Sequence, residues 1–307
     1  MSLTIDFVLN QRDDLGESPL WDSRDQCLYW IDSRRRLVQR IHPNTGAYQS
    51  WSSSQEIGSI ALCESGRILV ALQNNLQFLD TSTGLFSHFI DIQHPAERMR
   101  LNDGRTDKAG RLCLGSLVLG RHENHGVLYQ IDNAGRVKVL DKGFCVSNTT
   151  CFSPDGRWLY FADSLARQIW RYTYDVASGQ VGPRELFIDT QPFNSGPDGA
   201  TVDSEGRLWV AMVLSGQVVC FSSDGQLVQS IQVPVPYPTC PSFGGPDLST
   251  LYVTSIRDSG NLLKSNDPNS GALISIKGLD ARGLPEVLFA DGHLPQSLSG
   301  NPRGKLR

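Results

Sequence analysis

One pattern of hydrophobic and polar positions recurs six times along the chain. In each copy a polar turn punctuated by Gly or Asp leads into a short apolar strand that ends in small residues. The copies are DSRDQCLYWIDS (22–33), ESGRILVAL (64–72), KAGRLCLGS (108–116), SPDGRWLYFADS (153–164), SEGRLWVAM (204–212) and GPDLSTLYVTS (245–255). Their strands begin at intervals of 40, 44, 47, 49 and 43 residues. A repeat of about 45 residues with several short strands per copy is typical of a propeller blade, so the sequence predicts an all-β, six-bladed β-propeller.

Each repeat continues beyond its first strand. Two further strand-like stretches follow, and a Gly-containing turn separates them, as an antiparallel meander requires. In the first five repeats these turns are NTG (44–46), STG (82–84), NAG (133–135), ASG (177–179) and SDG (223–225). The N-terminal LTIDFVL (3–9) also alternates like a strand, and we expect it to complete the last blade, which removes an exposed sheet edge. We expect one domain over residues 1–292 and a flexible, polar tail over residues 293–307.

Composition narrows the classes of protein. The net charge of −4 among 307 residues, without any run of five or six like charges, argues against a nucleic-acid partner. No apolar run approaches the roughly 18 residues that span a membrane, and no signal peptide is expected. The seven cysteines are odd in number and form no CxxC pair, which indicates a reducing, cytoplasmic location. We expect a monomer or a small homo-oligomer.

Candidate chemistry appears at one position of the repeat. Equivalent residues just before the first strand of each blade should meet at one mouth of the central channel. Stepping back 10 or 11 residues from these strands reaches Glu17, Asn102, Asn148 and Asp198 in four repeats, and 57–58 and 240–241 in the others. Two carboxylates and two amides form an oxygen-rich site for a divalent cation, and the lack of His disfavours a usual zinc site. Any one of these residues alone could merely shape its turn, but their common register favours a shared site.

Three further residues lie at or beside these positions, and two of them have two readings. Arg100 lies two before Asn102, on the same strand face, and could bind a substrate hydroxyl or carboxylate oxygen or form a surface ion pair. Asp103 should point the other way and serve the turn. Cys240 occupies the channel register and could touch metal or substrate, although a wall residue is the simpler role.

At these residues the chain resembles the gluconolactonase family that includes regucalcin, also called senescence marker protein. The resemblance runs from about residue 10 to residue 292. It rests on five ordered motifs, which are GESPLWD (16–22), RLNDGRTDKAGR (100–111), SNTTCFSPDGRWLYFADS (147–164), GPDGATVDSEGRLWVA (196–211) and CPSFGGPDLSTLYVTS (240–255).

The resemblance implies a propeller with one divalent metal ion in its central channel, held by Glu17, Asn148 and Asp198, and with Arg100 and Asn102 contacting the substrate. It also implies hydrolysis of a sugar-acid lactone, such as glucono-, galactono-, xylono- or arabinono-lactone, to the free aldonic acid. Oxygen ligands select weakly among calcium, zinc, manganese and magnesium, so the identity of the ion stays open.

One position departs from the family pattern. Some relatives place a substrate-contacting Glu after the third signature strand, where this chain has Gly120, and Glu123 is a candidate replacement. We hypothesise that Asp198 both ligates the metal and accepts a proton from the attacking water. Two alternatives are another ester or phosphotriester hydrolase on the same scaffold, and a calcium-binding propeller without catalysis.

Overall fold

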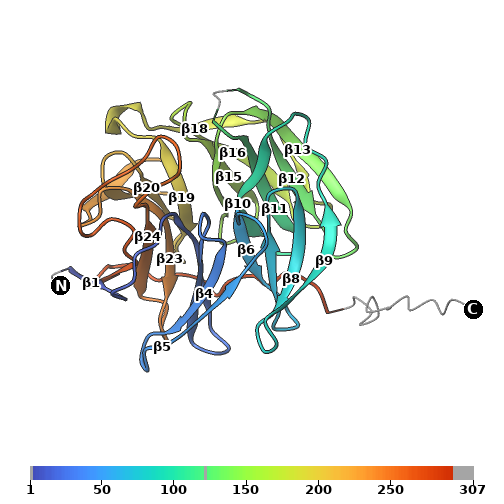
Figure 1. Cartoon of the computed structure of the whole chain (residues 1–307). Helices are drawn as coiled ribbons and strands as arrows, with labels where there is room; N and C mark the ends of the chain where they lie inside the picture. Colours follow the sequence, from blue (N-terminus) through green and yellow to red (C-terminus); the bar gives the residue numbers. More distant parts are fainter. Residues whose placement is uncertain (1–2, 121–122, 293–307) are drawn as a thin grey trace, which may run out of the picture.

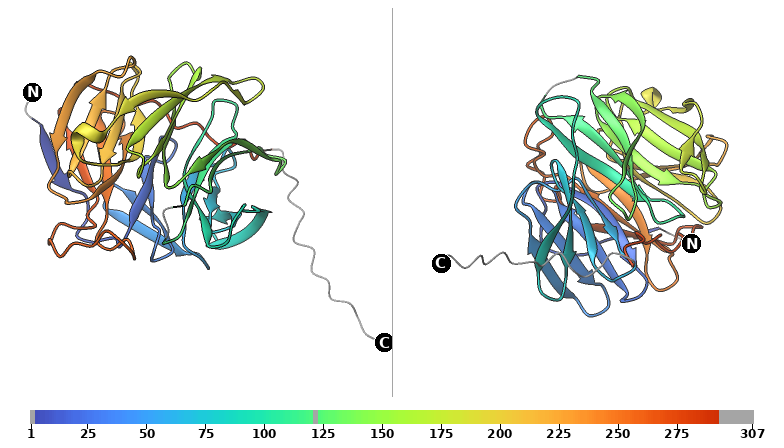
Figure 2. Two further views of the ribbon diagram at one scale, coloured as in Figure 1. Left: turned by 90° about the horizontal axis from the view of Figure 1, so that it is seen from above. Right: turned by 90° about the vertical axis from the view of Figure 1, so that its right-hand side faces the viewer.

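The computed structural model describes residues 3–120 and 123–292 as six antiparallel sheets around one central axis (Figures 1 and 2). The chain completes each sheet before it starts the next. The first strand of every sheet contacts the first strands of both neighbouring sheets, and these contacts close into a ring through β2, β6, β10, β14, β19 and β23. The predicted six-bladed β-propeller is therefore confirmed.

The first three blades each contain four strands in chain order from the axis outward. Blade 1 comprises β2 (Gly16–Asp22), β3 (Cys27–Asp32), β4 (Leu37–His42) and β5 (Ala47–Ser52). Blade 2 comprises β6 (Ser59–Leu62), β7 (Ile68–Ala71), β8 (Asn75–Asp80) and β9 (Leu85–Asp91). Blade 3 comprises β10 (Met99–Thr106), β11 (Leu112–Val118), β12 (Gly126–Ile131) and β13 (Val137–Phe144).

The other blades vary this plan. Blade 4 comprises β14 (Ser147–Phe152), β15 (Trp158–Asp163), β16 (Gln168–Asp175), β17 (Gln180–Val181) and β18 (Glu185–Asp189), and a single 3₁₀ turn, η1 (Gln191–Phe193), follows it. Blade 5 comprises β19 (Pro197–Val202), β20 (Leu208–Met212), β21 (Gln217–Phe221) and β22 (Leu227–Gln232). Blade 6 comprises β23 (Pro238–Gly244), β24 (Thr250–Ser255), β25 (Ile274–Lys277) and the N-terminal strand β1 (Thr4–Phe7). Within the described residues no helix has the length and apolar character needed to cross a membrane.

Blade 4 differs from the simple meander that the sequence predicts. Its outer strand is split, because β17 pairs with one end of β16 and β18 pairs with the other end. Pro183 lies between the two pieces. Proline has no N–H to donate to a neighbouring strand, so the ladder is interrupted there.

The N-terminal strand closes the ring as predicted. β1 pairs antiparallel with β25, from Thr4 opposite Lys277 to Phe7 opposite Ile274. The first and last parts of the chain therefore share one sheet, which gives β25 a partner on its outer side. The predicted tail, residues 293–307, lies outside the described residues.

The core is divided among the interfaces between blades. Six clusters of buried apolar side chains each join two neighbouring blades around the whole ring. Aromatic pairs strengthen several of these interfaces. Trp21 stacks on Tyr252 between blades 1 and 6, Trp209 meets Phe243 edge-on between blades 5 and 6, and Phe144 meets Phe161 edge-on between blades 3 and 4. The channel walls are consequently held from outside by apolar packing.

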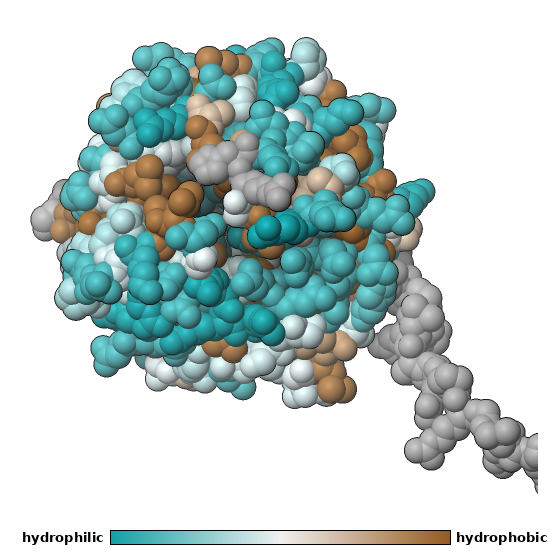
Figure 3. Space-filling model, turned by 45° about the horizontal axis from the view of Figure 1, so that its top comes forward, coloured by the Kyte–Doolittle hydropathy of each residue, from teal (hydrophilic) through white to brown (hydrophobic). Residues whose placement is uncertain are grey.

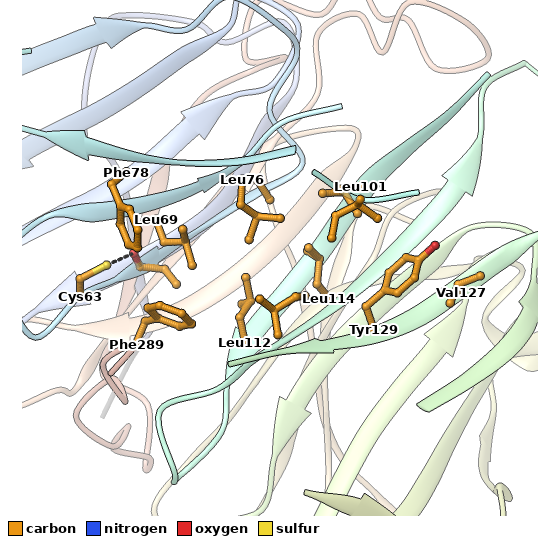
Figure 4. Close-up of a cluster of buried hydrophobic side chains, with 14 residues drawn as sticks. Cys63, Leu69, Leu76, Phe78, Leu101, Leu112, Leu114, Val127, Tyr129 and Phe289 are labelled. Carbon is orange, nitrogen blue, oxygen red and sulfur yellow. Dashed lines mark hydrogen bonds between the residues drawn. The ribbon is translucent and has the colours of Figure 1, made fainter. Parts of the chain in front are cut away.

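The residues after β25 form a strap, residues 278–291, across the face opposite the starts of the innermost strands. In Figure 1 the strap is the orange-red trace that passes below the sheets toward blade 2. It accepts a hydrogen bond from Ser204 in blade 5 and donates one from Gly283 to Leu248 in blade 6. Farther along, Phe289 donates to Leu62, and its ring packs beside Cys63, Phe78 and Leu112 between blades 2 and 3 (Figure 4). The strap thus links four blades.

The recurring turn before the second strand has a direct structural explanation. In blade 5, Asp203 accepts hydrogen bonds from the backbone N–H groups of Glu205 and Arg207, from Arg207 Nε at 2.7 Å and from Trp209 Nε1 at 2.9 Å. Gly206 has a φ of +82°, which a turn of this kind requires. The repeated Asp, Gly and Arg are therefore parts of one turn.

Replacing Asp203 by Ala should lower the free energy of unfolding by about 3 kcal/mol, because it leaves a largely buried guanidinium and an indole N–H without their acceptor. Asp132 is the matched control, since it makes the same turn with Arg136, whose side chain is 81% exposed. Asp132→Ala should cost only about 1 kcal/mol. Urea denaturation of both variants measures the difference, and equal losses would contradict this explanation.

A buried acid in blade 1 should make stability depend on pH. Asp13 accepts hydrogen bonds from Trp30 Nε1 and Gln39 Nε2, each at 2.9 Å. Burial, and then the charge of Asp32, raises the pKa of Asp13 to about 7 from its ordinary 3.8. Between these values the folded protein holds a proton that the unfolded chain has lost. The contribution of Asp13 to stability therefore falls as the pH rises through this window.

The difference in unfolding free energy between wild type and Asp13→Asn isolates this effect. The wild type should lose unfolding free energy relative to Asp13→Asn as the pH rises from about 4 to about 7. Urea denaturation at a series of pH values tests this, and parallel pH profiles for the two proteins would show that Asp13 titrates normally.

Candidate metal and substrate site

The innermost strands of five blades carry a β-bulge in the half of the strand nearest the predicted site. At each bulge two residues of the innermost strand lie opposite a single residue of the next strand. The bulged pairs are 18–19, 102–103, 149–150, 198–199 and 239–240. Glu17 and Asn148 directly precede their bulges, while Asn102 and Asp198 are the first residues of theirs. A bulge changes the direction of the side chains next to it. These four residues therefore depart from the regular alternation of side chains along a strand, and all four lie at the same end of the channel.

Two bulges contain non-glycine residues in the left-handed region. Ser18 has a φ of +50° and Thr149 a φ of +59°. Their side chains are fixed by the adjacent blades, since Ser18 Oγ accepts from Ile60 N at 3.1 Å and Thr149 Oγ1 donates to the Asp198 carbonyl at 2.5 Å. Such backbone conformations cost about 1 kcal/mol or more and persist where surrounding contacts enforce them. The bonds between blades therefore define the backbone next to Glu17 and Asn148.

The two amides of the predicted set contact each other directly. Asn102 Nδ2 donates to Asn148 Oδ1 at 3.0 Å and to the Ser147 carbonyl at 2.8 Å. Asn148 Nδ2 donates to Ser164 Oγ at 2.8 Å, which orients its amide. An amide oxygen has two lone pairs, so Asn148 Oδ1 can accept from Asn102 and still bind a cation.

The two carboxylates of the predicted set interact electrostatically. Burial raises the pKa of Glu17 well above its usual range, and the charges of Asp198 and Asp103 raise it further. Burial and Asp103 likewise raise the pKa of Asp198. Arg100 opposes both shifts. A cation between such groups would favour their ionised forms, so these carboxyls have properties expected of ligands for a cation.

Strand alternation predicts that Asp103 points away from the site, but the structure shows otherwise. Its Oδ2 accepts a hydrogen bond from Thr150 N at 2.6 Å, so it reaches β14 just as Asn102 does. The bulge at 102–103 explains the error, because two consecutive residues there share one opposing position. Burial raises the pKa of Asp103 as well. The channel therefore contains a third carboxyl that sequence reasoning missed.

Arg100 lies at the site and is half-buried. Burial lowers the pKa of its guanidinium, while Glu56, Glu17 and Asp198 act in the opposite direction. Its Nη1 donates to the Leu101 carbonyl at 3.0 Å. Within the part of the chain that the structure describes, no carboxylate lies within 4.0 Å of this guanidinium. Arg100 therefore forms no ion pair within that distance, and its charge acts on Glu56 as well as on Glu17 and Asp198 of the channel.

Two further residues of the sequence analysis have defined surroundings. Cys240 is buried in the channel wall, and burial raises the pKa of its thiol, with Glu17 and Asp103 adding to the rise. A Cβ on Gly199 would lie only 2.4 Å from Cys240 Sγ, so the two strands touch here. The Cys240 thiol is therefore neutral and packed. Glu123 lies 3.7 Å from His125 Nε2, on the loop between β11 and β12.

The charges of the channel fit a divalent cation. Within residues 3–120 and 123–292, no three His, Cys, Asp or Glu side chains are arranged to share one ion, but the predicted set offers two carboxylates and an amide oxygen instead. The charged groups that act on one another along the channel carry a net charge of −3 when all are ionised; they are the carboxylates of Glu17, Glu56, Asp103, Asp198 and Glu286 and the guanidiniums of Arg100 and Arg105. A divalent ion would offset most of this charge, and oxygen donors suit such an ion.

The predicted site residues lie in the first halves of the innermost strands. Figure 3 shows the face on which these strands begin, which is mostly hydrophilic and is hollowed near its middle. The opposite face carries the strap.

Comparisons with known proteins agree with the fold and the motifs. The family described as "SMP-30/Gluconolactonase/LRE-like region" matches residues 15–257. A 6-deoxy-6-sulfogluconolactonase from Pseudomonas putida is 37% identical over 94% of this chain and 100% of its own length. A pentonolactonase from Haloferax volcanii is 31% identical over 92% of this chain and 97% of its own.

A solved structure shows the same architecture. The calcium-binding protein regucalcin from Agrobacterium tumefaciens superposes with a TM-score of 0.86 at 28% identity, over 92% of this chain and 96% of that chain. The family motifs, the ring of six blades and the shared length agree along almost the whole sequence. The chain belongs to the SMP-30/gluconolactonase/LRE-like family.

Proposed function

We propose that the protein is a hydrolase that opens a sugar-acid lactone to the free acid and uses one divalent metal ion bound in the channel. The proposal rests mainly on two observations: the charge of Asp198 raises the pKa of the buried Glu17, and Asn102 on the neighbouring strand donates a hydrogen bond to Asn148 Oδ1. Membership in a family with relatives named as lactonases supports the same reaction. Calcium, zinc, manganese and magnesium are the candidate ions.

In this proposal Glu17, Asn148 and Asp198 hold the ion. When bound, the ion supplies Lewis-acid polarisation of the lactone carbonyl. Asp198 accepts the proton of the attacking water, because the ion keeps its carboxylate ionised and so able to act as a base. Arg100 and Asn102 orient the sugar through hydroxyl or acidic oxygens. The buried, neutral Cys240 takes no part as a nucleophile.

The proposed substrates are aldonolactones. Glucono-, galactono-, xylono- and arabinono-lactone form the first panel, and 6-deoxy-6-sulfogluconolactone joins it because a relative is named for that compound. The seven cysteines are all buried and unpaired, which supports a reducing, cytoplasmic location for this reaction.

Asp198→Asn tests the role of the proposed base. It should lower kcat by a factor of about 10² to 10⁴, the range that general acid–base catalysis supplies. The melting temperature should not fall, because the change removes one of several like charges that are buried together. Steady-state lactone hydrolysis and thermal unfolding are the measurements.

The control for this variant is Asp267→Asn, which changes an exposed carboxylate on the loop between β24 and β25. It should leave kcat unchanged. Near-wild-type hydrolysis by Asp198→Asn would remove Asp198 from the mechanism, and equal losses in both variants would point to a general effect of charge.

Metal binding should depend on pH in a defined direction. The carboxyls of Glu17, Asp103 and Asp198 have raised pKa values in the metal-free protein, so a bound cation must displace protons from them. Affinity for the ion should therefore rise as the pH increases above 4.5, the ordinary pKa of a glutamic acid. Isothermal titration calorimetry in buffers of different ionisation enthalpy measures the released protons. Binding without proton release and without pH dependence would contradict the assignment of these ligands.

A further inference from the structure

The channel has a second cluster of charge at its far end. β10 runs from Arg100 at the proposed metal site to Arg105 near the strap. Arg105 Nε lies 2.9 Å from Glu286 Oε1, and these side chains are only 14% and 11% exposed. Arg105 also donates to Thr201 Oγ1 in blade 5 at 3.3 Å. One strand thus connects the site to an ion pair on the strap.

The charge on Arg105 acts on Asp103, which lies between the two ends. The hydrogen bonds from Thr150, and then the charge of Arg105, hold the pKa of Asp103 lower than burial alone would set it. Asp103 in turn accepts the Thr150 backbone N–H at 2.6 Å, and Thr150 Oγ1 donates to the Asp103 carbonyl at 3.4 Å. These bonds join blade 3 to the bulge of blade 4.

That bulge carries the groups proposed to hold the ion. Asn148 directly precedes it, and Thr149, within it, donates through Oγ1 to the Asp198 carbonyl at 2.5 Å. A displacement of residues 149–150 would therefore move an amide ligand and loosen a carboxylate ligand in the next blade. The strained φ of Thr149 makes this backbone dependent on its contacts.

We propose that Arg105 and Glu286 are positioning residues for the metal site, acting through Asp103 on the bulge that presents Asn148 and contacts Asp198. This inference rests on the proposed function in one respect, namely that the site binds a divalent ion. The Glu286 carboxylate fixes the Arg105 guanidinium beneath Asp103. Without Glu286 the buried guanidinium lacks its partner and turns to the nearest remaining carboxylate, Asp103, which then leaves the Thr150 N–H.

Glu286→Gln tests the inference, because it keeps the size of the side chain and removes only the charge. It should weaken metal affinity by about 10- to 100-fold, the usual effect of losing a group that orients metal ligands. Equilibrium dialysis with Ca²⁺ and with Mn²⁺ measures the dissociation constants without reference to activity. The double variant Arg105→Met/Glu286→Leu replaces the pair by apolar groups, a change that often preserves stability, and should weaken binding as well.

Asp291→Asn is the matched control on the same strap. Asp291 is fully buried and pairs with Arg67 at 2.7 Å and with Ser65 Oγ at 2.5 Å, in blade 2 and away from the channel charges. Both single variants should lose stability in urea denaturation. Only Glu286→Gln should change the dissociation constant of the metal.

The outcomes separate this inference from the proposed activity. Equal changes in metal affinity in Glu286→Gln and Asp291→Asn, or no change in either Glu286→Gln or the double variant, would overturn the inference. Wild-type protein that binds neither ion would also overturn it, whether or not lactones are hydrolysed. If Glu286→Gln alone weakens metal affinity but the protein hydrolyses no lactone, the positioning role is supported and the catalytic function is rejected.

Discussion

Three carboxyls are buried together in the central channel, and the folded ring holds them there against their mutual repulsion. Burial and the charge of Asp103 raise the pKa values of both Glu17 and Asp198, and the charge of Asp198 also raises that of Glu17. Two guanidiniums, Arg100 and Arg105, offset part of the negative charge from the two ends of the same strand. The remaining negative charge is the basis for the proposal that the channel binds a cation.

The ring can hold this arrangement because its stabilising contacts lie elsewhere. Apolar clusters join every pair of neighbouring blades, and hydrogen bonds such as that from Thr149 Oγ1 to the Asp198 carbonyl cross between the innermost strands. Two segments at the ends of the chain close the ring: β1, which pairs with β25 in blade 6, and the strap, which ends at blade 2. Strain at the centre is therefore balanced by packing at the blade interfaces and by closure at the termini.

The repeat made the fold and much of the site predictable from sequence. A common register pointed to Glu17, Asn102, Asn148 and Asp198, because equivalent positions of a propeller are expected to converge, and a hydrogen bond joins two of the four, Asn102 and Asn148. Asp103 was assigned to the wrong side because alternation fails at a bulge, which no simple period reveals.

Other features lie outside the repeat and were not predicted. Glu286 is on the strap, which belongs to no repeat, and only the folded chain brings it to Arg105. The split of the outer strand of blade 4 depends on a local interruption of pairing near Pro183 rather than on the hydrophobic pattern. Sequence periodicity thus predicts what recurs in every blade, whereas contacts made once must be read from the three-dimensional structure.

If the proposed function is right, lactone hydrolysis by this protein requires a divalent ion in the channel. The most direct measurement determines metal content and turnover on the same preparation, after treatment with EDTA and after return of single ions, with the aldonolactone panel as substrates. Hydrolysis should stop when the metal is removed and should return when at least one of calcium, zinc, manganese or magnesium is added back. Full hydrolysis by metal-free protein, or a bound metal with no turnover of any lactone, would contradict it.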